Sequence, residues 1–214
     1  MPASAAFFRP SERTVDLGVL GGGLALGAGG AAGLTAAVLG TPDASRVVAA
    51  VLLYAAALPA TFLCALLLTA TLGGPRRVLL RRIDHAAIFV MIAATATPFA
   101  LDRLGLGWGW AATAAVWAAA AIGVFVKLRF PIGPPRSSAA AYILLGWFSL
   151  LAIGPAIASR RTLILIAAGV ACYLVGLVFH LWRRLPYHRA IWHVFVVLGA
   201  ACHYVAVIDG VVLG

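Results

Sequence analysis

Apolar runs of roughly twenty residues recur seven times along the chain, and short polar linkers separate them. A helix needs a run of about this length to cross the roughly 30 Å of hydrocarbon in a bilayer. The runs cover residues 16–40, 46–72, 84–101, 108–127, 138–158, 162–182 and 190–212. The pattern predicts an all-α polytopic membrane protein, folded as a bundle of seven transmembrane helices.

The linkers are too short to hold a soluble domain. We expect residues 1–15 to form an N-terminal tail and residues 16–214 to form one membrane domain. The tail is basic, but the apolar run that follows it is too long for a signal peptide and lacks a clear cleavage site. This run is therefore interpreted as the first transmembrane helix.

The basic residues alternate between the two sides of the predicted bundle. Twelve of the sixteen lie in the tail and in every second linker, and four lie on the opposite side. The twelve are Arg9, Arg13, Arg76, Arg77, Arg81, Arg82, Lys127, Arg129, Arg136, Arg183, Arg184 and Arg189. Because cytoplasmic loops carry the excess of Lys and Arg, we expect a multi-pass protein of the cell membrane. We expect its N-terminus to lie in the cytoplasm and its C-terminus outside.

Composition excludes several classes of protein. The chain is 64% hydrophobic and only 10% charged, with a mean hydropathy of +1.05, so a soluble domain of 214 residues is excluded. A net charge of +10 does not indicate a nucleic-acid partner, because the basic residues form short clusters between apolar runs. Cys64, Cys172 and Cys202 lie far apart in apolar runs and predict neither disulfides nor a metal motif.

The third run begins with a polar stretch, RRVLLRRIDH, that carries Asp84 to the edge of the hydrocarbon. Polar groups are costly to desolvate there, so Asp84 is a candidate functional residue. The alternative is an interfacial aspartate held by Arg81 and Arg82 with no further role, since charged side chains near helix ends can reach water.

Further polar residues fall at the same, cytoplasmic level of the predicted bundle. They are Thr69, His85, His180, His188 and His193. A zinc site needs three or four converging ligands, and His188 and His193 are five apart and do not share a helical face. A metal would therefore need ligands from several helices, such as His193, His180 and Asp84, and solvated interfacial histidines are the alternative.

The stretch RRIDHAAIFVMIAATATPF resembles the third helix of the hemolysin III family, within the superfamily of progestin and adiponectin receptors (PAQR). RRLPYHRAIWHVFVVLGAACHYVAV, residues 183–207, resembles the closing helix of that family. The resemblance covers roughly residues 60 to 207, with a weak similarity at Glu12 and Asp16. It implies a zinc ion at the cytoplasmic ends of the helices, held by three His, with an Asp holding a metal-bound water.

Only part of that implied zinc site is present. Asp84 and His193 match the family positions, whereas Thr69 and Arg189 stand where the other two His are expected. A hydroxyl is a poor zinc ligand, and a guanidinium stays charged and repels a cation.

Three outcomes follow from these departures. In the first outcome the site is degenerate, and Arg189 pairs with Asp84 in place of the metal. Alternatively, His180 and His188 substitute as ligands. A third reading shifts the alignment by one residue, which leaves His188 as a distorted ligand.

We therefore expect a protein that acts in membrane lipid homeostasis or binds lipids, with membrane lipids as its partners. The alternative is a ceramidase-like, zinc-dependent hydrolase of lipid amides, in which the metal activates water and Asp84 is the catalytic base. A transporter is disfavoured because charged residues are absent from the middle of the runs. No amphipathic pore-forming segment is evident, and the sequence names neither a protein partner nor an oligomeric state.

Overall fold

A computed structural model describes residues 10–39, 45–130, 133–154, 157 and 159–213. Within these ranges the chain is helical and has no β-strand. The helices are α1 (Pro10–Leu39), α2 (Ser45–Ala70), α3 (Gly74–Arg103), α4 (Gly105–Arg129), α5 (Pro135–Ile153), α6 (Arg160–Leu181) and α7 (His188–Val207). A short π-helical turn, η2 (Ile208–Val212), continues α7.

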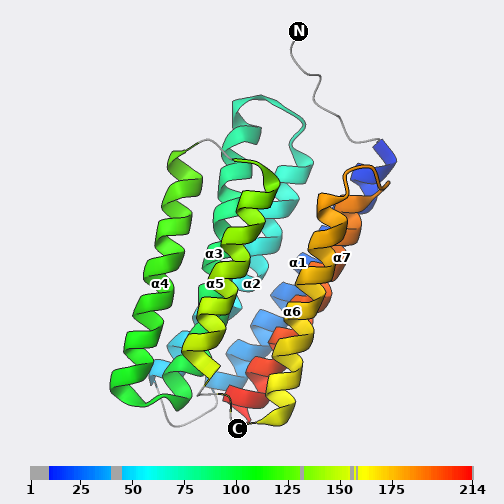
Figure 1. The fold of residues 1–214 in the computed structure, drawn as a ribbon. Helices are drawn as coiled ribbons and strands as arrows, with labels where there is room; N and C mark the ends of the chain where they lie inside the picture. Colours follow the sequence, from blue (N-terminus) through cyan, green and yellow to red (C-terminus); the bar gives the residue numbers. More distant parts are fainter. Residues whose placement is uncertain (1–9, 40–44, 131–132, 155–156, 158, 214) are drawn as a thin grey trace.

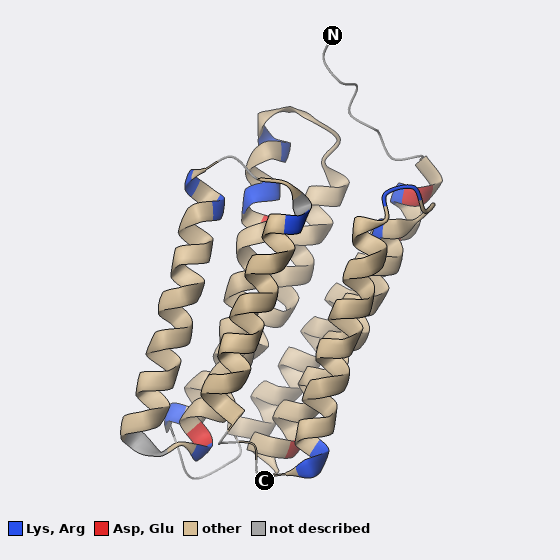
Figure 2. Cartoon of the chain, in the orientation of Figure 1, with Lys and Arg blue, Asp and Glu red and all other residues tan. Residues whose placement is uncertain are grey.

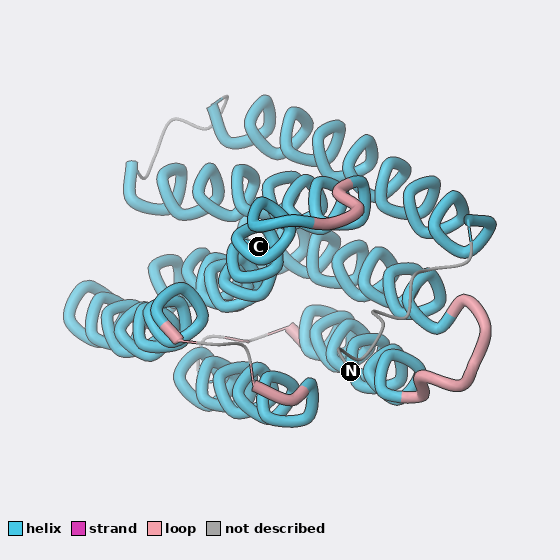
Figure 3. The backbone as a smooth tube through the Cα atoms, turned by 90° about the horizontal axis from the view of Figure 1, so that it is seen from above, coloured by secondary structure: helices cyan, strands magenta, loops and turns pink. Residues whose placement is uncertain are grey.

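All seven α-helices are long and apolar enough to cross a membrane. A helix satisfies its backbone hydrogen bonds internally, which hydrocarbon requires of any segment that crosses it. The helices run side by side as one bundle (Figure 3), and the start of α1 and the end of α7 lie at opposite ends (Figure 1). The prediction of a seven-helix bundle is confirmed.

The observed helix ends differ from the predicted spans in several places, most of all at the start of α3. α3 begins at Gly74 rather than at residue 84, and its 30 residues measure about 45 Å. This length exceeds the roughly 30 Å of hydrocarbon, so the arginine-rich first turns extend the helix beyond the apolar layer. α5 ends at Ile153, and its predicted end at residue 158 lies outside the described residues.

Helix α3 is the central element of the bundle. It packs against α2, α4, α5 and α7, while α1 lies against α2 and α7, and α6 lies mainly against α7. α4 and the α6–α7 pair therefore occupy opposite sides (Figure 1). The core between them includes the fully buried side chains of Leu34, Val51, Tyr54, Phe99 and Val116.

Glycines allow α6 and α7 to approach closely. A Cβ atom at Gly169 would lie 2.3 Å from Cδ2 of His203, and one at Gly199 would lie 2.6 Å from Cε1 of Tyr173. Real side chains do not tolerate such distances, so each glycine accepts an aromatic ring from the facing helix. Small residues at helix contacts have the same effect in other membrane bundles.

Basic residues gather at the end of the bundle where α1 begins (Figure 2). Among the Lys and Arg that the structure describes, only Arg46, Arg103, Arg160 and Arg161 belong to the opposite end, at the start of α2, the end of α3 and the start of α6. We refer to the end with the excess as the basic end. The predicted cytoplasmic location of this end stays a prediction.

Candidate functional site

A buried carboxylate near the basic end is the centre of the site. Asp16, in the second turn of α1, is 0% exposed. Its Oδ1 lies 2.5 Å from Nδ1 of His193, and its Oδ2 lies 3.9 Å from Nε of Arg189. The Thr69 hydroxyl donates a longer hydrogen bond of 3.5 Å to the same Oδ2. These four side chains, which we call the Asp16 cluster, join α1, α2 and α7.

The spacing of the two α7 residues explains why both reach Asp16. Arg189 and His193 are four residues apart, so they project from the same face of the helix. An ionised carboxylate can only accept hydrogen bonds, so Nδ1 of His193 carries the proton in this contact. The other ring nitrogen, Nε2, does not take part in the hydrogen bond to Asp16.

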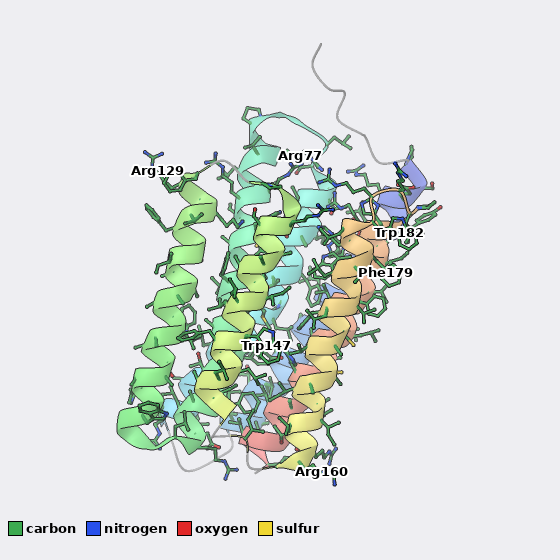
Figure 4. The ribbon with its side chains drawn as sticks, viewed as in Figure 1. Arg77, Arg129, Trp147, Arg160, Phe179 and Trp182 are labelled. Carbon is green, nitrogen blue, oxygen red and sulfur yellow. The ribbon has the colours of Figure 1, made fainter. Side chains whose placement is uncertain are left out.

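Two arginines fix the end of α2 that carries Thr69. Arg13 donates from Nε to the Thr69 carbonyl at 3.0 Å and from its terminal nitrogen to the Ala70 carbonyl at 2.5 Å. Arg77, labelled in Figure 4, donates to the Leu68 carbonyl at 3.0 Å. The last carbonyls of a helix lack partners within the helix, and cations there also interact favourably with its dipole.

Asp84 extends the site to α3. It lies within electrostatic range of His193, Arg189 and Asp16. The family resemblance implied a zinc site at the positions of Thr69, Asp84, Arg189 and His193. The structure brings these four residues together in one region. Arg189 forms an ion pair with Asp16 and also lies in the electrostatic field of Asp84. The pairing of Arg189 with Asp84 that the sequence suggested stays a prediction.

The two substitute ligands suggested from the sequence have other neighbours. His188 begins α7, and its Nδ1 lies 3.2 Å from the Leu185 carbonyl. The His180 ring lies 5.3 Å from the Trp192 ring, between centroids, although it is within electrostatic range of Arg189 and His193. Across the described ranges no group of three or more His, Cys, Asp or Glu side chains could hold a metal ion.

The residues present therefore do not fit the zinc ion that the family resemblance implies. His193 is the one histidine in the Asp16 cluster. The Arg189 guanidinium occupies the position one helical turn earlier on α7. A buried carboxylate requires a cation or hydrogen-bond donors, and Arg189, His193 and Thr69 supply them to Asp16. The cluster can thus neutralise its own carboxylate without a metal.

A second polar group lies near Asp84 and was not found from the sequence. Lys127 on α4 is buried, and its Nζ donates a 2.6 Å hydrogen bond to the Ser138 hydroxyl on α5. Its Nζ also lies 5.8 Å from the centre of the Tyr142 ring. The Tyr142 hydroxyl donates to the backbone carbonyl of His85, the residue after Asp84. This group ties α4 and α5 to the segment of α3 that carries Asp84.

Comparison with known proteins relates this arrangement to a family. The family model described as "Haemolysin-III related" matches residues 23–204 of the chain. The chain belongs to the hemolysin III family. The match includes Thr69, Asp84, Arg189 and His193, but Asp16 lies before it. This hemolysin III family member is a multi-pass membrane protein.

Two curated relatives come from bacilli. "Hemolysin-3" of Bacillus cereus is 37% identical over 129 residues, which are 59% of this chain and 58% of that protein. "Hemolysin-3 homolog" of Bacillus subtilis (strain 168) is 36% identical over 132 residues, 61% of this chain and 62% of that protein. The aligned segments thus span about three fifths of these relatives. No solved structure matches the chain significantly.

Proposed function

We propose that this hemolysin III family member acts in membrane lipid homeostasis or lipid binding, and that an internal ion-pair cluster replaces a metal at its polar site. The contact between Asp16 and Arg189 carries the proposal. The Arg189 guanidinium lies beside the carboxylates of Asp16 and Asp84, where a divalent cation would otherwise balance their charge.

The cluster is better suited to holding helices together than to hydrolysis. Its charged groups come from α1 and α7, with Thr69 from α2, and Asp84 of α3 lies within electrostatic range. The Asp16 carboxylate already has three polar neighbours, and Asp16 has no exposed surface. We therefore assign the cluster a structural role in a bundle whose partners are the surrounding lipids.

A zinc-dependent hydrolase of lipid amides is the second candidate. One observation favours it: the Nδ1 of His193 donates to a carboxylate, the arrangement that orients a metal-binding imidazole in many proteins. Two features weigh against it, namely the charge of Arg189 and the lack of a third ligand among the described residues. The metal would need a rearranged set of ligands drawn from Asp84, His180 and His188.

The protein is further proposed to lie in the cell membrane with its basic end in the cytoplasm. This orientation follows from the excess of Lys and Arg at the end where α1 begins. Anionic lipids of the cytoplasmic leaflet attract such clusters.

The lipid role is tested by comparing membranes of cells that express the wild-type protein, the variant Asp16→Asn or no protein. Lipid composition is measured by mass spectrometry, and bilayer order by fluorescence anisotropy, at equal abundance of both variants. We expect the wild-type protein alone to change these properties. Arg160→Gln, an exposed substitution at the opposite end of the bundle (Figure 4), is the control and should behave as wild type.

Two results would count against this assignment. Membranes with the wild-type protein that match those without it would remove the proposed lipid role. Release of fatty acid from a lipid amide by the purified protein, lost with a chelator and restored by zinc, would favour the hydrolase.

A further inference from the structure

A lateral groove lies between α2, α3 and the end of α4, apart from the Asp16 cluster. Its volume is about 240 Å³. The residues along it include Ala57, Ala60 and Thr61 of α2, Ile83 and Ala87 of α3, and Leu128 of α4. The small alanine side chains leave the hollow, and the groove opens on the outside of the bundle, where Ala60 is exposed.

The chemistry of the groove suits a hydrocarbon chain. Thr61 is the one polar residue that lines it, and its hydroxyl donates to the Ala57 carbonyl at 2.8 Å. The groove is therefore almost without groups that could bind a polar ligand. Small-molecule pockets usually measure about 300–1,000 Å³, so this groove suits a segment of one acyl chain rather than a whole lipid.

An arginine adjoins the groove, since Arg82 directly precedes the lining residue Ile83 on α3. The Arg82 guanidinium donates from one terminal nitrogen to the Leu128 carbonyl at 2.9 Å, while the Leu128 side chain lines the groove. A guanidinium has five N–H donors, so further donors are available for a ligand. Arg82 makes no ion pair with any carboxylate that the structure describes.

Along α3 the arginine comes first, on the side of the basic end, and the apolar groove follows. A phospholipid has the same order, with a charged headgroup followed by acyl chains. The α3 residues that line the groove begin at Ile83, directly after Arg82, and continue to Val90. This stretch extends about 10 Å along the helix axis. Two exposed arginines lie nearby: Arg81 directly precedes Arg82, and Arg129 directly follows Leu128. Figure 4 shows Arg129 at the basic end of α4.

The geometry points to a binding site for an anionic phospholipid, with an acyl chain in the groove and the phosphate group on Arg82. Hydrocarbon burial attracts any lipid to the groove, and the guanidinium adds a preference for a net negative headgroup. The site does not depend on the proposed role of the Asp16 cluster.

Native mass spectrometry of the delipidated protein tests this site with two probes, phosphatidylglycerol and phosphatidylcholine of identical chains. We expect the wild-type protein to bind phosphatidylglycerol preferentially. Arg82→Gln should lower this preference about fivefold, since one basic residue near the surface is worth about 1 kcal/mol toward anionic lipids. Arg82→Lys keeps the charge and should retain most of the preference.

Matched controls separate this site from general surface charge. Arg183→Gln removes an exposed arginine at the same end, between α6 and α7, and should leave the preference unchanged. Ala60→Phe should fill the groove and reduce binding of both lipids, whereas Ala56→Phe, on the exposed surface of α2 outside the groove, should not.

Three outcomes would overturn the proposal. They are equal binding of the two lipids by the wild-type protein, equal effects of Arg82→Gln and Arg183→Gln, and unchanged binding after Ala60→Phe. Arg82→Lys and Ala60→Phe also provide the test if Arg82→Gln fails to fold.

Discussion

Replacing Asp16 by Asn tests the cluster through its most buried member. The substitution keeps the shape of the side chain and an oxygen that can accept the proton of His193 Nδ1. It removes the negative charge that lies 3.9 Å from the Arg189 guanidinium. The expected effect is therefore the loss of an ion pair, with little change in packing.

Breaking one partner from a buried ion pair commonly costs about 3–5 kcal/mol. The lower end applies here because the Arg189 side chain is 24% exposed and lies in the field of Asp84 as well. We expect a loss of about 3 kcal/mol in the free energy of unfolding. For a chain of this size, each kcal/mol corresponds to about 2–4 °C in Tm, so Tm should fall by about 6–12 °C.

Thermal unfolding of the purified protein in one detergent, followed by intrinsic tryptophan fluorescence, measures this change. Arg189→Gln should be at least as damaging, because it leaves both Asp16 and Asp84 without the guanidinium. In the double variant the two losses should overlap, so the combined effect should be smaller than their sum by about 1–2 kcal/mol. An unchanged Tm for Asp16→Asn, or strictly additive losses, would refute the ion pair as a source of stability.

Three further predictions concern the same region and the topology. Thr69→His combined with Arg189→His should create tight zinc binding, measured by metal analysis after dialysis, and no gain of metal would argue against a shared site. Asp84→Ala should lower Tm, because it removes a carboxylate whose field acts on Arg189; an unchanged thermal profile would argue against a contribution of Asp84 to the site. Alkaline phosphatase fused after Gly214 should be active outside the cell, and a cytoplasmic C-terminus would refute the proposed orientation.

The helices were predictable from the sequence because lipid enforces a simple rule. A segment that crosses hydrocarbon must be apolar over about 20 residues, and seven such runs gave seven helices. The ends were less predictable, since hydropathy detects the apolar layer and not the helix itself. α3 continues through Arg76, Arg77, Arg81 and Arg82, where the apolar signal is weak but the backbone remains helical.

The polar site was predictable in part. Alignment to the family positions indicated Thr69, Asp84, Arg189 and His193, and the structure brings them together around one region. For Asp16 the sequence showed only a weak similarity to the family. It lies at the polar boundary of the first apolar run, where an interfacial Asp is common. Its burial depends on the contact of α1 with α2 and α7, which no local sequence pattern specifies.

The groups formed by Lys127 and Arg82 were missed for a related reason. In sequence both residues belong to basic clusters that determine orientation, and such clusters are normally solvated. In the structure Lys127 is buried against Ser138, and Arg82 reaches the carbonyl of Leu128 on another helix. The register between α3, α4 and α5 decides these partners.

The central proposal is that the Arg189 guanidinium takes the place of the zinc ion that the family resemblance implies. Metal analysis by inductively coupled plasma mass spectrometry of the full chain, purified without chelator from zinc-supplemented cells, tests it most directly. We predict far less than one zinc ion per chain. One tightly held zinc ion per chain, lost on Asp84→Ala or His193→Ala, would contradict the claim.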